Sequence, residues 1–357
     1  MNVRLLSRLV RINGWRQVLA RLFIEARVYI RYSTVRKLLN LVRVLWQYRR
    51  KSLVAQGYPY RYYIEPTNAC NLRCPFCFGW QERSRRTWGT MGLDMFKSLV
   101  DEIAPYAYWI DLYNRGEPLL HADLCEMIAY AHERGIGTKI GSNLHNLDNH
   151  GAQRLVESGL DYLVVALDGA TQESYANYRV GGDIRVVLQN LRALTACKRR
   201  LKTATPYITI RTLIMRQNEN ELGAIKAIAE ELGVDNVIFT PMIVNIRGKD
   251  ADQWLPSKPM HSFYDYERRC NTIARGNAAC IELWSRGTIN SDGRVFPCCF
   301  ADGIGEELGN LTDSDFLNIW NNERYQASRA VFSDARPGKP SEVATVCTSC
   351  RGFRKTR

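Results

Sequence analysis

The chain has 357 residues, of which 46% are hydrophobic and 24% are charged, and its formal net charge is +13. This composition excludes a disordered or collagen-like chain. No apolar stretch reaches the roughly 18 residues that a transmembrane helix needs, and Arg4, Arg8 and Arg11 stand where a secretory signal would be uncharged. We therefore expect a folded cytoplasmic protein of two or three domains.

Nearly all of the excess charge lies in residues 1–51, which hold thirteen basic side chains and one acidic side chain. The net charge of this segment is +12, so the remaining 306 residues are almost neutral at +1. A neutral body without an array of basic and aromatic residues on strands argues against nucleic-acid binding. The excess positive charge is instead confined to residues 1–51, which we call the basic arm.

The basic arm is expected to be helical, with a break at Gly14, because its apolar residues recur at helical spacing. Two interpretations stay open: the helices lie on an anionic membrane surface, or they pack their apolar stripe on the neighbouring domain. A mitochondrial transit peptide is disfavoured by the length of the arm and its few serines. The stripe consists of Leu5, Leu9, Trp15, Leu19 and Phe23, followed by Leu38, Leu39, Val42, Leu45 and Trp46.

Eleven cysteines are spaced too unevenly for a secreted disulfide framework, so we expect metal binding in a reducing compartment. Cys70, Cys74 and Cys77 form a C-x3-C-x2-C triplet. Three thiolates on one tight loop can ligate three irons of a 4Fe–4S cluster and leave the fourth iron open. A zinc ion would normally need a fourth protein ligand close by.

The stretch IEPTNACNLRCPFC, with Phe76 before the third cysteine, resembles the signature of the radical S-adenosylmethionine (SAM) enzymes. The resemblance implies that SAM chelates the open iron and that a reductant of the flavodoxin or ferredoxin type donates one electron. Cleavage of SAM would then give a 5'-deoxyadenosyl radical that removes a hydrogen atom from the substrate.

The same resemblance implies an α/β fold with a partial (β/α)6 TIM-type barrel, an N-terminal helical arm and a small C-terminal α+β iron–sulfur domain. Hydrophobic patterning independently predicts strands at 62–65, 109–113, 138–141, 162–167, 207–214 and 237–239. Helices are predicted between them at 93–104, 124–134, 152–158, 184–197 and 219–232. We expect the arm in residues 1–57, the barrel in 58–250 and the iron–sulfur domain in 251–357.

Polar residues after the later strands resemble SAM contacts of the family. In Asn-Arg-Gly-Glu-Pro, Gly116 and Glu117 would receive the SAM amino group, although Arg115 stands where the family usually has glycine. The resemblance further implies polar contacts near the ribose and, from a side chain pointing into the barrel, a partner for the SAM carboxylate. The candidates are Ser142 and Asn143 near the ribose and Arg211 for the carboxylate. Asp168, after the fourth strand, stands in a Leu-Asp-Gly context that the family also shows and is a further SAM-site candidate.

The C-terminal cysteines are framed by a predicted hairpin around Gly293 that delivers Cys298. This segment resembles the SPASM or shortened twitch extension, which implies one auxiliary 4Fe–4S cluster here. Cys299 competes with Cys298, because neighbouring residues on a strand point to opposite faces. A four-cysteine zinc site is the alternative. The expected ligands are Cys280, Cys298, Cys347 and Cys350.

The predicted function is that of a radical SAM enzyme whose auxiliary cluster assists oxidation or substrate handling. We expect a natural product, a sugar or a lipid-linked metabolite as its substrate, the last if residues 1–51 contact a membrane. A peptide-modifying maturase is the alternative, disfavoured because the first 57 residues look helical and lack the strands of a leader-recognition domain. A non-catalytic zinc or iron–sulfur protein ranks below both.

Overall fold

The computed structural model describes residues 3–77, 88–244, 251–267, 270–271, 280–301, 303–333 and 343–350. The chain forms two compact units, each drawn from three separate stretches. The first unit comprises Met1–Arg27, Cys70–Gln81 and Ile140–Ala274, and the second comprises Val28–Ala69, Glu82–Lys139 and Arg275–Arg357. These units do not follow the order of the sequence. The predicted division into an arm (1–57), a barrel (58–250) and an iron–sulfur domain (251–357) therefore stays a prediction.

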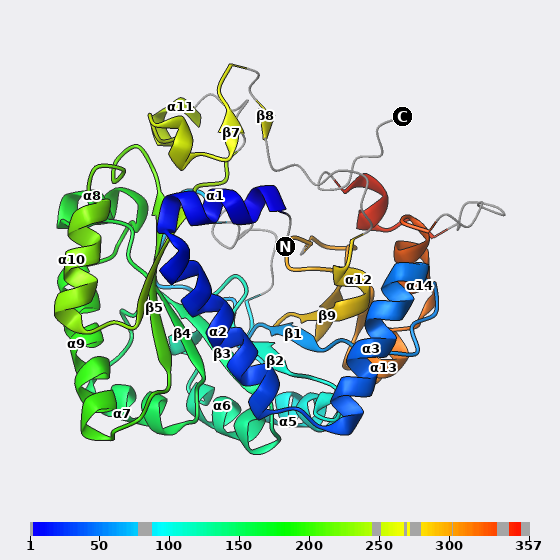
Figure 1. Ribbon diagram of the computed structural model, residues 1–357. Coiled ribbons are helices and arrows are strands. Elements are labelled where there is room, and N and C mark those ends of the chain that lie inside the picture. Colours follow the sequence, from blue (N-terminus) through cyan, green and yellow to red (C-terminus); the bar gives the residue numbers. More distant parts are fainter. Residues whose placement is uncertain are drawn as a thin grey trace. The chain divides into compact units, whose positions relative to one another are not determined.

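The second unit is built on a mixed sheet (Figure 1). Strands β9, β1, β2 and β3 are parallel neighbours in that order, and β10 and β11 continue antiparallel beyond β9. The predicted hairpin is thus β9–β10, turned at Gly293 with a φ of +80° that favours glycine. The strands are β1 (Arg61–Ile64), β2 (Trp109–Asp111), β3 (Gly137–Ser142), β9 (Arg286–Ile289), β10 (Arg294–Phe296) and β11 (Gly309–Asn310).

Helices belong to this unit as well, and Cys347 lies in the last helical segment, η4 (Val346–Ser349). The longest is α3 (Val35–Arg50), which is capped by the Thr34 side chain accepting from the Lys37 amide. The other helical segments of the second unit are α5 (Leu93–Ile103), η2 (Pro118–Leu120), α6 (Leu124–Glu133), α12 (Glu282–Ser285), α13 (Phe316–Ile319), α14 (Glu323–Ala330) and η4 (Val346–Ser349).

The first unit holds the parallel strands β4 (Tyr162–Ala166), β5 (Tyr207–Ile214) and β6 (Asn236–Pro241). Helices α7 (Asn149–Glu157), α8 (Gln172–Tyr178), α9 (Ile184–Arg200) and α10 (Leu222–Leu232) follow the βα order (Figure 1). Short elements complete it: α11 (Ala251–Trp254), η3 (Pro259–His261), β7 (Tyr264–Asp265) and β8 (Cys270–Asn271). All six predicted strands and all five predicted helices are present, and α8 adds a helix that the pattern missed.

The basic arm is helical, as predicted. It consists of α1 (Val3–Asn13), α2 (Trp15–Arg31) and α3, with Gly14 at a φ of +81° between the first two. Helix α1 packs on β6, where the Asn13 side chain donates to the Phe239 carbonyl at 3.0 Å and accepts from the Phe239 amide at 2.6 Å. Within the described residues, no helix has the length and apolar character needed to cross a bilayer.

A buried ion cluster joins the first three strands. The Asp111 carboxylate on β2 is fully buried and accepts two hydrogen bonds from Arg61 on β1, at 2.6 and 3.0 Å. The Lys139 ammonium on β3 lies 3.5 Å from the same carboxylate. Burial alone would raise the pKa of Asp111, but these two cations hold it at about 2. The charge is therefore compensated inside the sheet.

Replacing Asp111 by Asn should lower the free energy of unfolding by about 3–5 kcal/mol at neutral pH, because two partly buried cations lose their counter-ion. Since the folded pKa lies below the unfolded value of about 3.9, this stability is present above that pH and fades as pH falls towards 2. Denaturant unfolding at several pH values measures it. Glu126→Gln, which breaks the exposed pair with Lys97, is the matched control and should cost less than about 1 kcal/mol. Equal losses in the two variants would contradict the prediction.

Candidate functional site

The cysteine triplet lies on a tight loop of the first unit. The Cys70 thiol is exposed, Cys74 is buried and Cys77 is partly buried, and all three are free thiols. The loop folds on itself, since the Leu72 amide donates to the Cys70 Sγ at 3.5 Å and the Cys77 amide donates to the Cys74 carbonyl at 3.1 Å. The C-x3-C-x2-C spacing therefore folds into one compact thiol-bearing turn.

Two further donors reach the sulfur atoms. The Asn143 side-chain amide lies 4.0 Å from the Cys70 Sγ and donates to the Asn71 side chain at 2.7 Å. The Arg179 guanidinium donates to the Cys74 Sγ at 3.6 Å. Donors aimed at sulfur suit thiolates that ligate an iron–sulfur cluster, whose potential depends on such hydrogen bonds. The residues present thus fit the cluster that the sequence implies.

Arg179 is the residue that sequence reasoning missed. It follows α8, and its Nε donates to the Asp168 Oδ2 at 2.5 Å. Asp168 is fully buried, and its other carboxylate oxygen accepts from the Leu213 amide of β5 at 2.6 Å. Burial works against the arginine charge, but Asp168 and then Cys74 raise the pKa of Arg179. No spacing signal marks this residue, because Arg179 and Cys74 lie 105 residues apart in the sequence.

Ser142 and Arg211 have different surroundings. Ser142 ends β3 and is 4% exposed, and its hydroxyl accepts from the Leu144 amide at 2.8 Å. Arg211 is exposed, whereas its neighbours Ile210 and Thr212 are fully buried on the other side of β5. The direction of the Arg211 side chain into the barrel and its contact with SAM both stay predictions.

The glycine-rich turn after β2 belongs to the second unit. A Cβ on Gly116 would lie 2.0 Å from the Thr67 carbonyl oxygen and 2.7 Å from that of Ala69, so only glycine fits. The Glu117 amide donates to the Ala69 carbonyl at 2.7 Å, and its carboxylate caps η2 by accepting from the Leu119 amide. This turn therefore packs on the chain that immediately precedes Cys70.

Arg115, the departure from the family pattern, has a defined place. Its amide donates to the Glu65 Oε1 at 3.0 Å, and its guanidinium donates to the Cys299 carbonyl at 2.7 Å. The adjacent Asn114 side chain donates to Asn290 of the β9–β10 turn at 3.2 Å. The turn after β2 is thus fastened to the loop that carries the C-terminal cysteines.

The four predicted C-terminal ligands gather in the second unit. Cys298 follows β10, and Cys347 and Cys350 lie at η4. Burial raises the pKa of the Cys280 and Cys347 thiols to about 12. Electrostatic repulsion adds to this rise, from Cys298 and Cys347 on Cys280 and from Cys298 and Cys350 on Cys347. Buried thiols with raised pKa values become ligands when a metal centre compensates their charge.

Cys299 differs from these four. Burial also raises the pKa of Cys299, to about 11. The charges of Cys298 and Glu282 raise this pKa further, whereas those of Arg286 and Arg115 lower it. The choice between Cys298 and Cys299 as a cluster ligand stays a prediction. Among the residues that the structure describes, no three His, Cys, Asp or Glu side chains are placed to hold a single metal ion.

Comparisons with known proteins agree with these features. Residues 64–229 match the radical SAM superfamily, and residues 280–351 match SPASM, an iron–sulfur cluster-binding domain. The AdoMet-dependent heme synthase of Methanosarcina barkeri is 24% identical, over 80% of this chain and 86% of that protein. Mycofactocin maturase MftC of Mycobacterium tuberculosis is 25% identical, over 81% of this chain and 76% of that protein.

Solved structures share the fold. SuiB of Streptococcus suis bound to SAM aligns with a TM-score of 0.62 at 14% identity, over 87% of this chain and 74% of that one. The enzyme anSMEcpe with bound AdoMet aligns with a TM-score of 0.57 at 17% identity, over 83% and 87% of the two chains. The predicted α/β class with a partial TIM-type barrel is confirmed.

A double-mutant cycle tests the buried pair of Asp168 and Arg179. Arg179→Gln and Asp168→Asn should each cost about 3–5 kcal/mol of unfolding free energy in the iron-free protein, because each leaves a buried charge unpaired. The double variant should be more stable than the sum of the two losses implies. The exposed pair Arg192 and Glu231 in the same unit is the matched control and should give a coupling below about 1 kcal/mol. Additive losses at Asp168 and Arg179 would refute the coupling.

Proposed function

The chain carries a radical SAM domain followed by a SPASM domain, and from this premise we propose that it removes a hydrogen atom from a non-peptide metabolite. The substrate is a natural product, a sugar or a lipid-linked compound. The observation that supports the radical reaction most directly is the Cys70–Cys77 loop, whose sulfur atoms receive donors from Asn143 and Arg179. When bound, the 4Fe–4S cluster and SAM supply reductive cleavage of SAM and a 5'-deoxyadenosyl radical.

In this proposal, Cys70, Cys74 and Cys77 hold the cluster and an apolar wall shields it. Leu72 and Cys74 belong to a buried cluster with Tyr178 and Met215, and Phe76 and Cys77 pack against it. The Phe76 ring meets Trp254 edge to face at 5.2 Å. A dry surrounding strengthens the hydrogen bonds to sulfur and limits access of water to the reactive centre.

The SAM contacts are part of the same proposal. Gly116 lets the backbone approach closely, and Glu117 accepts from the SAM amino group. Ser142 and Asn143 serve the ribose side, and Arg211 pairs with the carboxylate. Asp168 acts on the site through Arg179, because both of its carboxylate oxygens are already engaged by Arg179 and the Leu213 amide. Their chemistry is binding and orientation.

Cys280, Cys298, Cys347 and Cys350 hold one auxiliary 4Fe–4S cluster in this proposal. When bound there, this cluster would supply an electron acceptor for a net oxidation of the substrate, for example of an alcohol to a carbonyl. The one electron that cleaves SAM comes from a flavodoxin- or ferredoxin-type protein. A redox-neutral hydrogen transfer, such as an epimerisation, is the alternative outcome for the same radical.

A peptide substrate is the second candidate. SuiB has been solved with its precursor peptide, and anSMEcpe with a peptide. The arm of this chain argues for a metabolite, because the described residues ahead of β1 form three helices and no strand. A lipid-linked metabolite requires peripheral membrane contact through residues 1–51, which carry the +12 charge.

Anaerobic reconstitution should give about eight irons per chain and reductant-dependent release of 5'-deoxyadenosine, as two 4Fe–4S clusters require. The triple variant Cys70→Ala, Cys74→Ala, Cys77→Ala should keep about four irons and release no 5'-deoxyadenosine. Cys125→Ala, at a partly buried thiol outside both sets, is the control and should match the parent protein. Two zincs per chain and no SAM cleavage in the parent protein would end the proposal.

The choice between Cys298 and Cys299 is tested by paired variants. Cys298→Ser should lose the auxiliary cluster, seen as a drop of about four irons and of its electron paramagnetic resonance signal. Cys299→Ser should retain both, because Cys299 is not part of the proposed ligand set and a neighbouring residue on a strand points to the opposite face. The reverse result would assign the ligand to Cys299.

A further inference from the structure

Helix α3 is turned with its polar side inward. Its buried residues are Lys37, Asn40, Val44 and Gln47, of which three are polar or charged. Its exposed side carries six large apolar side chains with exposed fractions from 42% to 75%. They are Val35, Leu38, Leu39, Val42, Leu45 and Trp46. A helix of a globular protein normally buries such a stripe, so this inversion calls for a partner.

The orientation of α3 is fixed by hydrogen bonds within the second unit. The Lys37 ammonium donates to the Gly135 carbonyl at 2.6 Å. Asn40 exchanges two hydrogen bonds of 2.9 Å with the backbone of Tyr58, and the Gln47 side chain accepts from the Gly57 amide at 2.9 Å. Rotating α3 to bury its apolar stripe would break all of these bonds. The stripe therefore stays outside while the unit is folded.

Cations border the apolar stripe on one side. Arg36, Arg43 and Arg50 recur every seven residues, which places them on nearly one line along an α-helix. Arg50 also lies over the Trp46 ring, 4.4 Å from its centroid. No acidic residue occurs anywhere from residue 26 to residue 64. Two copies of this face would set arginine against arginine, so the charge pattern disfavours self-association and favours an anionic surface.

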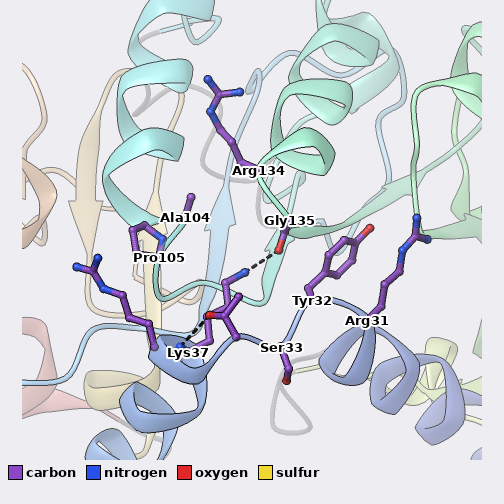
Figure 2. Close-up of a pocket in the computed structure, with 10 residues that line it drawn as sticks. Arg31, Tyr32, Ser33, Lys37, Ala104, Pro105, Arg134 and Gly135 are labelled. Carbon is purple, nitrogen blue, oxygen red and sulfur yellow. Dashed lines mark hydrogen bonds between the residues drawn. The ribbon is translucent and has the colours of Figure 1, made fainter.

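A basic cavity of about 400 Å³ lies at the N-terminal end of α3. Figure 2 shows Lys37 bonded to Gly135 there, with Arg31 and Arg134 on neighbouring elements. Arg36 lines the same cavity, whereas Arg134 also pairs with Asp101. None of the described residues that line the cavity is acidic. The arginine row and the cavity thus continue one cationic surface.

We infer that α3 is a membrane-docking helix whose apolar stripe inserts into the headgroup region at the surface of an anionic phospholipid bilayer. The arginine row then meets the lipid phosphates, as in other interfacial helices. This inference names the partner surface that the lipid-linked branch of the proposed function needs. It can be measured without that reaction, so the two can fail separately.

The full-length protein is tested by co-sedimentation with vesicles of phosphatidylcholine alone and of phosphatidylcholine mixed with phosphatidylglycerol. We expect binding to the anionic vesicles and little to the neutral ones. The variant Leu39→Glu/Val42→Glu should weaken anionic-vesicle binding at least about tenfold, because two charges enter the apolar stripe. Ile304→Glu, at a side chain 78% exposed elsewhere in the same unit, is the matched control and should bind like the parent protein.

A second variant separates charge from apolar contact. Arg43→Gln/Arg50→Gln should weaken anionic-vesicle binding by about fivefold per charge removed and leave unfolding unchanged. Release of 5'-deoxyadenosine without vesicles should be the same in all variants. Vesicle binding unaffected by both α3 variants would overturn the inference. A dimer of the parent protein that Leu39→Glu/Val42→Glu converts to a monomer, without vesicle binding, would assign the stripe to a second copy of the chain instead.

Discussion

The cysteine loop depends on one buried ion pair, that of Asp168 and Arg179. Asp168 follows β4 and is fully buried, and its carboxylate accepts a hydrogen bond from the Leu213 amide of β5. The sheet therefore sets the position of this carboxylate. Arg179 donates a hydrogen bond to that carboxylate, which fixes the position of its guanidinium. The same guanidinium donates a hydrogen bond to the Cys74 sulfur. A buried charge without its partner is costly, so strand, helix α8 and cysteine loop are constrained together. A rigid supporting contact of this kind keeps cluster ligands in register.

The second unit solves a related problem with backbone contacts. Gly116 admits a carbonyl where any side chain would clash, which brings the turn after β2 against the segment before the cysteine loop. Arg115 then fastens the same turn to the carbonyl of Cys299, next to the predicted ligand Cys298. Arg115, which departs from the glycine-rich family pattern, thus links the turn after β2 to the loop that carries Cys299 within the second unit.

The basic arm is divided between two roles. In α1, the Asn13 side chain accepts a hydrogen bond from the backbone of β6. In α3, most of the buried residues are polar and pack on the second unit, whereas the large apolar residues are exposed. The expectation that the whole apolar stripe packs on a neighbouring domain is therefore wrong for α3. The exposed apolar side chains of α3 and the arginines beside them are the observations on which the inference of a membrane-docking helix rests.

Local patterns in the sequence determined the cysteine spacing, the six strands, the hairpin at Gly293 and the break at Gly14, because each depends on residues close together in the chain. Arg179, the pairing of β9 with β1 and the inward polar face of α3 were decided only by tertiary structure. Periodicity places the stripe of α3 on one side of the helix, yet it cannot say which side the domain covers. That choice rests on Gly57, Tyr58 and Gly135, whose backbone groups find their partners on α3 only once the chain has folded.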